Sequence, residues 1–176
     1  MARVTYITEE GHPELAELIG RLKAGRRGSL INIYRLLLNS PALAETWFAH
    51  ANIVRWKTEL SGRLRELVII RVAYLNRCAY VLRQHVPNLA LADGVSEAEC
   101  DTLADWRAST LFAAPERAAL AYADAMTREI DVADAVFEAL RPHYSERQIV
   151  ELTVLIATYN MLTRILQALQ VDLEPT

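Results

Sequence analysis

The sequence predicts one domain built only of α-helices. Apolar residues recur at spacings of three and four along most of the chain, which is the period of an amphipathic helix. Runs that alternate apolar and polar residues are missing, and no tight turn joins two such runs into a hairpin. The 176 residues are enough for one domain with a buried core and too few for two well-sized domains, so we expect a single domain over 1–176.

Turn residues divide the first third of the chain into three helices. Pro13 favours the first turn of a helix that ends in the glycine-containing stretch 25–28. A second helix is expected over 29–39, and Pro41 begins a third. The third helix carries side chains that we expect to pack, namely Trp47, Phe48, His50 and Trp56. The stretch 25–28 is also a candidate phosphate-binding loop, but no strand is expected before it and no Lys-Ser or Lys-Thr pair follows at the required spacing.

Serine residues mark the starts of the next helices. The chain is interrupted at Ser61, before the segment 63–87 in which we place the candidate site. Ser96 and Glu99 have the spacing of a capping box, in which each side chain satisfies a free amide of the first turn. This pair predicts a helix that continues to about Arg107.

Three further helices are expected in the C-terminal third. They are one over 115–129, a short one over 131–141 capped by Asp131, and a last one over 146–170 that follows Ser145. The last helix is apolar most of the way round, with Ile149, Leu152, Leu155, Ile156, Tyr159, Leu162, Leu166 and Leu169 on one side and Val150, Val154, Met161 and Ile165 on the other. Such a helix needs cover on several sides, so we expect it to lie centrally or between copies of a self-associating chain.

Composition and charge limit the partners. A formal net charge of −3, from 19 basic and 22 acidic residues, gives no positive field for phosphates, so no nucleic-acid partner is expected. The N-terminus lacks a secretory pattern, and the apolar stretch 67–75 contains Arg71 and falls far short of the roughly 20 residues that span a membrane, so no membrane partner is expected. Two cysteines, Cys78 and Cys100, are too few for a disulfide framework, which favours a reducing, cytoplasmic location.

The segment 63–87 carries the candidate site. Cys78 and His85 are seven residues apart, which places both on nearly the same face of one helix. Glu66 precedes Cys78 by twelve residues, and a straight helix would hold the two about 18 Å apart. Because Asn76 is a poor interior helix residue and a good cap, we predict a break there that folds Glu66 back toward the other two.

This arrangement predicts chemistry at Cys78, His85 and Glu66. A cysteine in the first turn of a new helix, next to Arg77, has its thiolate form favoured, which makes Cys78 a candidate nucleophile. His85 can move protons near neutral pH, and Glu66 can orient the imidazole or act as a base. The alternative is that Cys78 and His85 are core residues that share a face by chance. Tyr80 points away from Cys78 and is expected to pack.

The central block resembles the carboxymuconolactone decarboxylase and alkylhydroperoxidase D-like family. The residues that carry the likeness are Arg65-Glu66-Leu67, Arg71-Val72-Ala73, Asn76-Arg77-Cys78-Ala79-Tyr80, Gln84-His85 and Gly94-Val95-Ser96-Glu97-Ala98-Glu99, with Tyr159-Asn160 in the last helix. The core motif covers 61–99, and the likeness extends over most of the chain from about Pro41. Residue types and spacings agree together, which makes the match specific.

The resemblance implies an alkylhydroperoxidase D-like helical fold and a homo-oligomer, often a trimer or a hexamer. Decarboxylase members of the family process a carboxylated lactone by proton transfer and need no redox cofactor. Peroxidase-like members use a Cys-x-x-Cys pair, with a downstream His and an upstream Glu that relay protons. Glu66, Cys78 and His85 match the family positions one by one, and no cofactor is expected.

Two positions depart from the family pattern. Val81 stands where peroxidase-like members have their second thiol, and Val81-Leu82 stands where many single-cysteine members have Glu-Trp. An intramolecular dithiol cycle is therefore not expected unless the fold brings Cys100 within bonding geometry of Cys78. We expect Val81 and Leu82 to contact the substrate, and Arg71 or another arginine to hold its carboxylate.

Three functions stay open. The leading hypothesis is a cofactor-free decarboxylase-type enzyme, in which Glu66 or His85 moves a proton on a small carboxylated lactone or a related ring compound. The second is a thiol peroxidase that uses Cys78 alone with an external thiol. The third is a catalytically silent helical oligomer that binds a small apolar ligand or serves as a scaffold. A metal site of Cys78, His85, Glu66 and His50 is disfavoured, because the closely spaced ligand pairs of zinc sites are absent, and no metal is expected.

Overall fold

The computed structural model describes residues 1–26 and 28–174. Within these ranges every regular element is helical, which confirms the predicted fold class. The α-helices are α1 (Ala16–Ala24), α2 (Asn32–Leu37), α3 (Pro41–Trp56), α4 (Gly62–Leu75), α5 (Ala79–His85), α6 (Glu97–Thr102), α7 (Ala114–Arg128), α8 (Asp134–Glu138) and α9 (Glu146–Leu169). Shorter helical turns are η1 (Pro13–Leu15), η2 (Val86–Ala90) and η3 (Leu103–Ala108).

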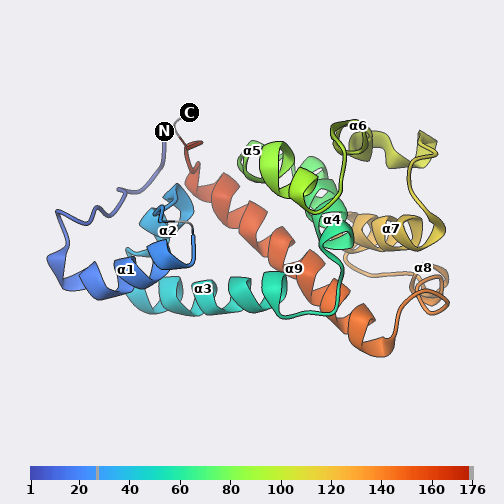
Figure 1. Cartoon of the computed structure of the whole chain (residues 1–176), viewed down its shortest axis with the longest axis horizontal. Helices are drawn as coiled ribbons and strands as arrows, with labels where there is room; N and C mark the ends of the chain where they lie inside the picture. The colour runs from blue at the N-terminus through green and yellow to red at the C-terminus, as the bar shows by residue number, and fades with distance from the viewer. Residues whose placement is uncertain (27, 175–176) are drawn as a thin grey trace.

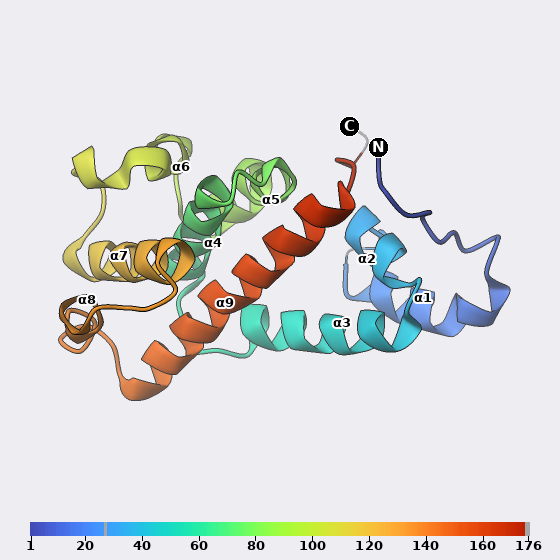
Figure 2. The ribbon, with the colours of Figure 1, turned by 180° about the vertical axis from the view of Figure 1, so that it is seen from behind.

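The longest helix, α9, runs diagonally through the middle of the molecule (Figure 1). It packs against α3 on one side and against α4 and α7 on the other, an arrangement that Figure 2 shows from behind. The N- and C-termini lie together at one end of α9. There the amide of Arg3 donates to the carbonyl of Leu169 (2.9 Å), and the hydroxyl of Tyr6 donates to Asp172 (3.0 Å). The N-terminal segment is thereby tied to the end of the last helix.

Helices α4 and α9 contribute more residues to the main apolar cluster than any other helix of the described chain. The middle of α4 is buried on all sides, through Leu67, Val68, Ile69, Ile70, Val72 and Ala73. By length and composition alone α9 could cross a membrane. In the fold it buries one side, through Ile149, Leu152, Leu155, Ile156, Tyr159 and Leu166. The predicted central position of the last helix is therefore confirmed. Its outer face leaves Val150, Val154 and Met161 exposed.

The serine caps place three helix starts as predicted. Ser61, Ser96 and Ser145 each accept a hydrogen bond from the backbone amide three residues further on. The carboxylate of Glu99 also accepts a hydrogen bond from the backbone amide of Ser96 (2.8 Å), which completes the predicted capping box. These caps fix where α4, α6 and α9 begin.

Several helix boundaries differ from the prediction: the helix expected over 29–39 is Asn32–Leu37, and the end of α6 and the whole of α8 also differ. Helix α6 ends at Thr102 and the chain continues as η3, because Asp105 has non-helical backbone angles (φ −134°, ψ 56°). Helix α8 begins at Asp134, so the expected cap at Asp131 was wrong. Ile130 adopts a left-handed conformation (φ 67°), and the amide of Asp131 donates back to Glu129, which places Asp131 in a turn.

Candidate active site

A tight turn separates α4 from α5 at the predicted break. Arg77 adopts a left-handed conformation with φ 52°. The amide of Cys78 donates to the carbonyl of Ala73 (2.9 Å), and the amide of Arg77 donates to the carbonyl of Tyr74 (3.1 Å), which are the two bonds of a Schellman cap. Cys78 is the N-cap residue of α5. The predicted break is therefore confirmed, and Cys78 lies just before the first turn of the new helix.

Polar side chains of α9 hold this turn in place. The side-chain nitrogen Nδ2 of Asn76 donates to Oδ1 of Asn160 and to Oγ1 of Thr163, both at 2.9 Å. The side-chain nitrogen Nε2 of Gln167 donates to the backbone carbonyl of Arg77 (2.8 Å). This carbonyl has no partner within a helix, because Arg77 is left-handed and lies between α4 and α5. The angle between α4 and α5 thus depends on a helix more than 80 residues away in the sequence.

The turn brings Glu66 and His85 together. Nδ1 of His85 lies 2.6 Å from Oε2 of Glu66. Both side chains are buried, with 0% of Glu66 and 6% of His85 exposed. The prediction that a break near residue 76 lets the upstream carboxylate reach the imidazole is therefore confirmed.

Charges around this pair fix its protonation. Burial raises the pKa of Glu66, but the hydrogen bond and charge of His85 and the nearby Arg55 and Arg65 together bring the pKa below its usual value. Burial lowers the pKa of His85 more than Glu66 raises it, so the imidazole is neutral near pH 7. Because an ionised carboxylate can only accept a hydrogen bond, we assign the proton to Nδ1. Nε2 then carries a free lone pair.

Nε2 of His85 faces the side chain of Tyr159 on α9. The Tyr159 hydroxyl lies 3.5 Å from Nε2, and the two rings meet edge to face with centroids 5.6 Å apart. Burial raises the pKa of Tyr159 to about 12, so its hydroxyl stays protonated and can donate a hydrogen bond.

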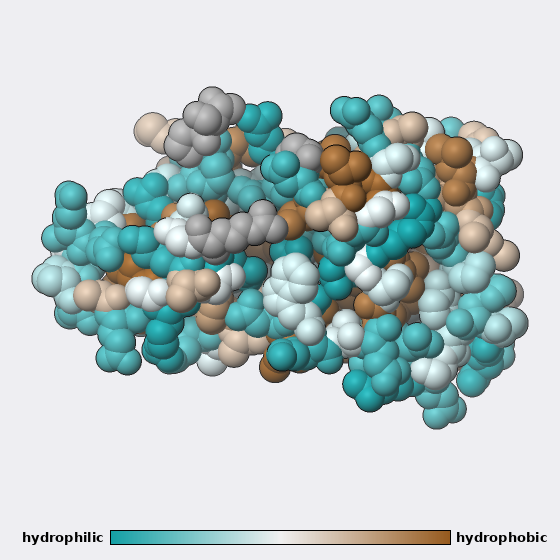
Figure 3. All heavy atoms as spheres, in the orientation of Figure 1, coloured by the Kyte–Doolittle hydropathy of each residue, from teal (hydrophilic) through white to brown (hydrophobic). Residues whose placement is uncertain are grey.

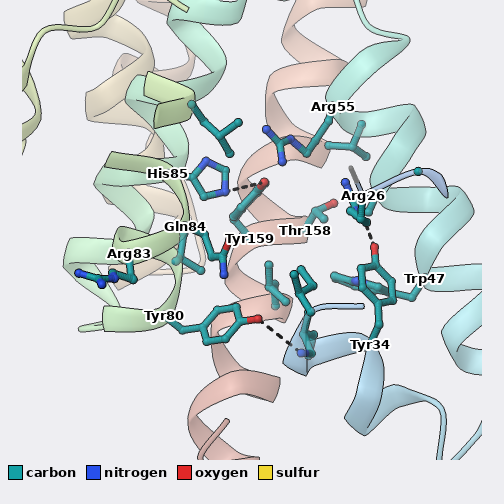
Figure 4. Close-up of a pocket in the computed structure, with 18 of the residues that line it drawn as sticks. Arg26, Tyr34, Trp47, Arg55, Tyr80, Arg83, Gln84, His85, Thr158 and Tyr159 are labelled. Carbon is teal, nitrogen blue, oxygen red and sulfur yellow. Dashed lines mark hydrogen bonds between the residues drawn. The ribbon is translucent and has the colours of Figure 1, made fainter. Parts of the chain in front are cut away.

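His85 and Tyr159 line a cavity of about 290 Å³ (Figure 4). The cavity lies among α2, α3, α5, α9 and the segment that follows α1. Side chains in its wall include Arg26, Tyr34, Trp47, Arg55, Tyr80, Val81, Gln84 and Thr158. Val81 lies in the cavity wall, and its predicted contact with a substrate stays a prediction. Glu66 lies outside the wall and supports His85 through Nδ1.

Cys78 differs from its prediction. Its side chain is 1% exposed, belongs to the main apolar cluster and is absent from the cavity wall. Burial raises the pKa of Cys78, and hydrogen bonds from the amides of Val81 and Tyr80 offset only part of that effect. The expected preference for thiolate was therefore wrong. Cys100 is also a free, buried thiol in a separate cluster, and burial raises its pKa to about 11.

Arg71 was the wrong arginine for a substrate carboxylate. Its guanidinium makes a two-pronged contact with Asp124, at 2.6 Å from Nε and 2.9 Å from Nη2. Nη1 donates to the carbonyls of Leu103 and Ala104, both at 2.8 Å. Arg71 therefore joins α4 to α7 and η3, away from the His85 cavity. Its donors are used to hold the fold.

Two other predictions need correction. Leu82 does not line the cavity, because it packs at the boundary between the two apolar clusters. Tyr80 packs as expected, but its ring also lines the cavity and its hydroxyl donates to Glu174 (2.5 Å). His50 lies against Thr158 (2.8 Å), and no cluster of three potential metal ligands occurs in the part of the chain that the structure describes.

Sequence analysis missed Arg26, Arg55 and Thr158 as parts of the site. Arg55 lies in α3, Thr158 in α9 and Arg26 after α1, so each reaches the cavity from a different element. No short motif contains Arg55 or Thr158, and Arg26 lies in the stretch 25–28 that the sequence offered only as a disfavoured phosphate-binding loop. The one local indication is Gly25, whose missing side chain lets the turn before Arg26 approach α3.

Comparisons with known proteins agree with this geometry. Residues 41–125 match the carboxymuconolactone decarboxylase family. The chain is 30% identical over 111 residues to the uncharacterised protein YdfG of Bacillus subtilis, an alignment that covers 62% of this chain and 75% of that protein.

Solved structures show the same fold. A protein of unknown function from Agrobacterium tumefaciens, described as a putative antioxidant defence protein AhpD, is 30% identical with a TM-score of 0.75 over 80% of this chain and 97% of its own. An uncharacterised peroxidase-related protein from Ralstonia eutropha with an alkylhydroperoxidase AhpD core has a TM-score of 0.83 at 18% identity, over 98% of this chain and 92% of its own. The chain therefore belongs to the carboxymuconolactone decarboxylase family and has its alkylhydroperoxidase D-like helical fold.

Proposed function

We propose that this protein is a cofactor-free enzyme that transfers a proton at a ring carbon of a small carboxylated compound such as a lactone. The observation that carries the proposal is the Glu66–His85 pair, in which the buried carboxylate holds Nδ1 and leaves Nε2 beside Tyr159 at the cavity. The name of the family points to the same class of substrate. The cavity has the size of a small-molecule site.

In the proposed reaction the neutral imidazole of His85 takes a proton from a carbon next to a carbonyl group. The electron pair of the broken C–H bond moves onto the carbonyl oxygen, and Glu66 stabilises the imidazolium that forms. The hydroxyl of Tyr159 donates a hydrogen bond to the developing oxyanion. Where the compound loses carbon dioxide, the electron pair of the broken C–C bond stays on the ring, and a solvent proton carried by His85 replaces the carboxyl group.

Hydrogen exchange tests this proposal. Small carboxylated lactones are incubated with the protein in D₂O, and NMR follows deuterium uptake at the ring carbons and loss of the carboxyl group. We expect the wild-type rate to fall about a hundredfold or more in His85→Gln, since a positioned base contributes about that much. Cys78→Ser should keep the rate. A folded wild-type protein that leaves every such lactone unchanged would overturn the proposal in favour of a silent ligand-binding oligomer.

A thiol peroxidase that uses Cys78 is a second candidate. It is favoured by the description of the 30% identical Agrobacterium protein as a putative antioxidant defence protein. The Cys78 thiolate would attack the O–O bond of a peroxide to give a sulfenic acid and, with a solvent proton, an alcohol. One external thiol would then form a mixed disulfide with Cys78 and release water, and a second would free the Cys78 thiol and leave as the external disulfide. Buried Cys78 would first have to become accessible. Peroxide consumption that Cys78→Ser abolishes, without lactone chemistry, would favour this function.

A further inference from the structure

Arg26 reaches the cavity without a carboxylate partner among the described residues, unlike the buried Arg71 and the part-buried Arg63. Arg71 binds Asp124 with two contacts, and Arg63 binds two glutamates at 2.5 and 2.7 Å. In the described part of the chain, Arg26 has no carboxylate oxygen within 4 Å; its one hydrogen bond goes to the hydroxyl of Tyr34 (2.7 Å). A partly buried cation without a counter-charge costs free energy, which a bound anion would recover.

The position of Arg26 is built into the fold. Its guanidinium lies over the rings of Tyr34 and Phe48, at 5.3 and 5.6 Å from their centroids. A Cβ atom at Gly25 would lie 2.3 Å from the tip of the Phe48 ring, so a larger residue before Arg26 would have to push that ring aside. Nε of Arg26 is buried without a hydrogen-bond partner among the described residues.

Arg55 adds a second incompletely paired guanidinium to the same cavity. Its Nη2 lies 3.4 Å from Glu66, but that carboxylate also binds His85 and lies 3.8 Å from Arg65. Nε of Arg55 likewise has no partner in the described ranges, and its guanidinium stacks 4.7 Å from the Trp56 centroid. Arg55 thus shares its carboxylate with His85, whereas Arg65 also binds Asp93 at 2.6 Å. Among the described residues the cavity wall contains Arg26, Arg55 and Arg83 and no carboxylate, so it keeps an excess of positive charge.

Both guanidinium groups lie close to the proposed proton-transfer pair. Figure 4 shows Arg26 and Arg55 on the side of the cavity where the Thr158 hydroxyl points, next to Tyr159. The charges of Arg55 and Arg26 also counter part of the rise that burial causes in the pKa of Tyr159. An anion held by the two arginines would therefore lie within a few atoms of Nε2 of His85.

We infer that Arg26 and Arg55 together bind the carboxylate of the ligand and turn its ring toward His85. The planar edge of a guanidinium suits a carboxylate. The aromatic walls from Tyr34, Trp47 and Tyr80 and the volume of about 290 Å³ fit one planar ring of five or six atoms. The orientation toward His85 rests on the proposed function, whereas the carboxylate site itself is testable by binding alone.

Calorimetry with 2-furoate and 2-furamide tests the inference, because the two share a ring and differ in charge. Wild-type protein should bind furoate at least tenfold more tightly than furamide. Arg26→Gln should weaken furoate about tenfold or more and leave furamide unchanged, while Arg26→Lys should restore part of the loss. Arg21→Gln, which removes an exposed arginine of α1 paired with Glu45, is the matched control and should change furoate affinity less than about twofold.

The possible results distinguish failure of the carboxylate site from failure of the proposed proton transfer. Equal wild-type affinity for furoate and furamide would overturn the inference, and this comparison needs no variant to fold. Inorganic phosphate that displaces furoate equally well would also overturn it, since the site would then select charge alone. Furoate binding that depends on Arg26, together with no deuterium exchange in any carboxylated lactone, would uphold the site and reject the proposed proton transfer.

Discussion

Three groups approach the buried carboxylate of Glu66: His85 at 2.6 Å, Arg55 at 3.4 Å and Arg65 at 3.8 Å. Glutamine at this position keeps the shape of the side chain and removes its charge, so the largely buried Arg55 would lose its carboxylate partner, while Arg65 would keep Asp93 at 2.6 Å. We expect Glu66→Gln to lower the free energy of unfolding by about 3 to 5 kcal/mol, the usual cost of breaking a buried charge pair. Urea denaturation at pH 7 measures this change.

Glu45 provides the control for charge removal. It pairs with Arg21 at 2.7 Å, but both side chains are about half exposed, at 52% and 56%. Solvent screens such a pair, so Glu45→Gln should change the free energy of unfolding by less than about 1 kcal/mol. A Glu66→Gln loss no larger than this would contradict the stabilising role assigned to the buried carboxylate.

The lowered pKa of His85 makes stability depend on pH. An unfolded chain protonates histidine near pH 6.5, about the ordinary value, whereas the folded protein takes up this proton only at lower pH. As the pH falls below about 6.5 the unfolded state therefore binds more protons, and folding weakens. Glu66 has the same effect at lower pH, because its pKa in the folded protein is also lowered. The stabilisation that its carboxylate gives disappears as the pH falls through that lowered pKa.

We expect the free energy of unfolding to be smaller at pH 5 than at pH 7. As the pH falls, the contribution of His85 is lost first and that of Glu66 at lower pH. His85→Gln removes the first contribution, so the difference between the two pH values should shrink in that variant. Urea denaturation at both pH values gives the measurement. An identical difference in wild type and variant would mean that His85 is protonated in the folded protein.

The Glu66–His85 contact could be predicted because only one turn had to be placed between two residues of the same segment. Arg55 could not, since it reaches the site through the packing of α3 and belongs to no local pattern. Arg71 shows the opposite error. It lies in the family block, yet its partner Asp124 is 53 residues away, and only tertiary structure reveals that its donors are taken.

At the scale of the elements, the turn between α4 and α5 depends on α9. Asn76→Ala removes the contacts with Asn160 and Thr163 and leaves two polar groups of α9 without this partner. We expect a cost of about 1 to 3 kcal/mol in unfolding free energy. Deuterium exchange on the lactone should also slow, because the angle of the turn sets the distance between Glu66 and His85.

Arg77→Gly is the control at the same turn. Glycine adopts φ 52° without strain and keeps the contacts of Asn76, so relief of strain and greater freedom of the unfolded chain should offset each other within about 1 kcal/mol. If Arg77→Gly and Asn76→Ala lowered stability and exchange equally, the contacts with α9 would not be what holds the turn.

Helix starts capped by serine were more predictable than boundaries set by backbone conformation. Ser61, Ser96 and Ser145 cap their helices through atoms three residues away, so a short window of sequence contains the whole interaction. The end of α6 and the start of α8 depend instead on unusual backbone angles at Asp105 and Ile130. Neither is glycine, so composition gave no sign of these turns.

At the scale of the whole molecule, the apolar character of α9 predicted that it lies centrally or between copies of the chain. It did not predict which faces of the helix the single chain covers. The fold covers the faces that carry Leu152, Leu155 and Ile156 and leaves Val150, Val154 and Met161 in solvent. Spacings of four and seven residues put the exposed three on one stripe. We propose that this stripe, which the single chain leaves uncovered, packs against a second copy of the chain.

Glutamate at positions 154 and 161 tests this proposal. The double variant Val154→Glu, Met161→Glu places two charges in the suggested interface, while at exposed positions each should cost the single chain little. Light scattering after size exclusion should give a smaller mass than for wild type, with unchanged helical circular dichroism. Leu111→Glu, at a 48% exposed site between η3 and α7, should leave the mass unchanged. A wild type that is already monomeric at micromolar concentration would mean that the stripe is simply solvated, as scattered apolar surface residues often are.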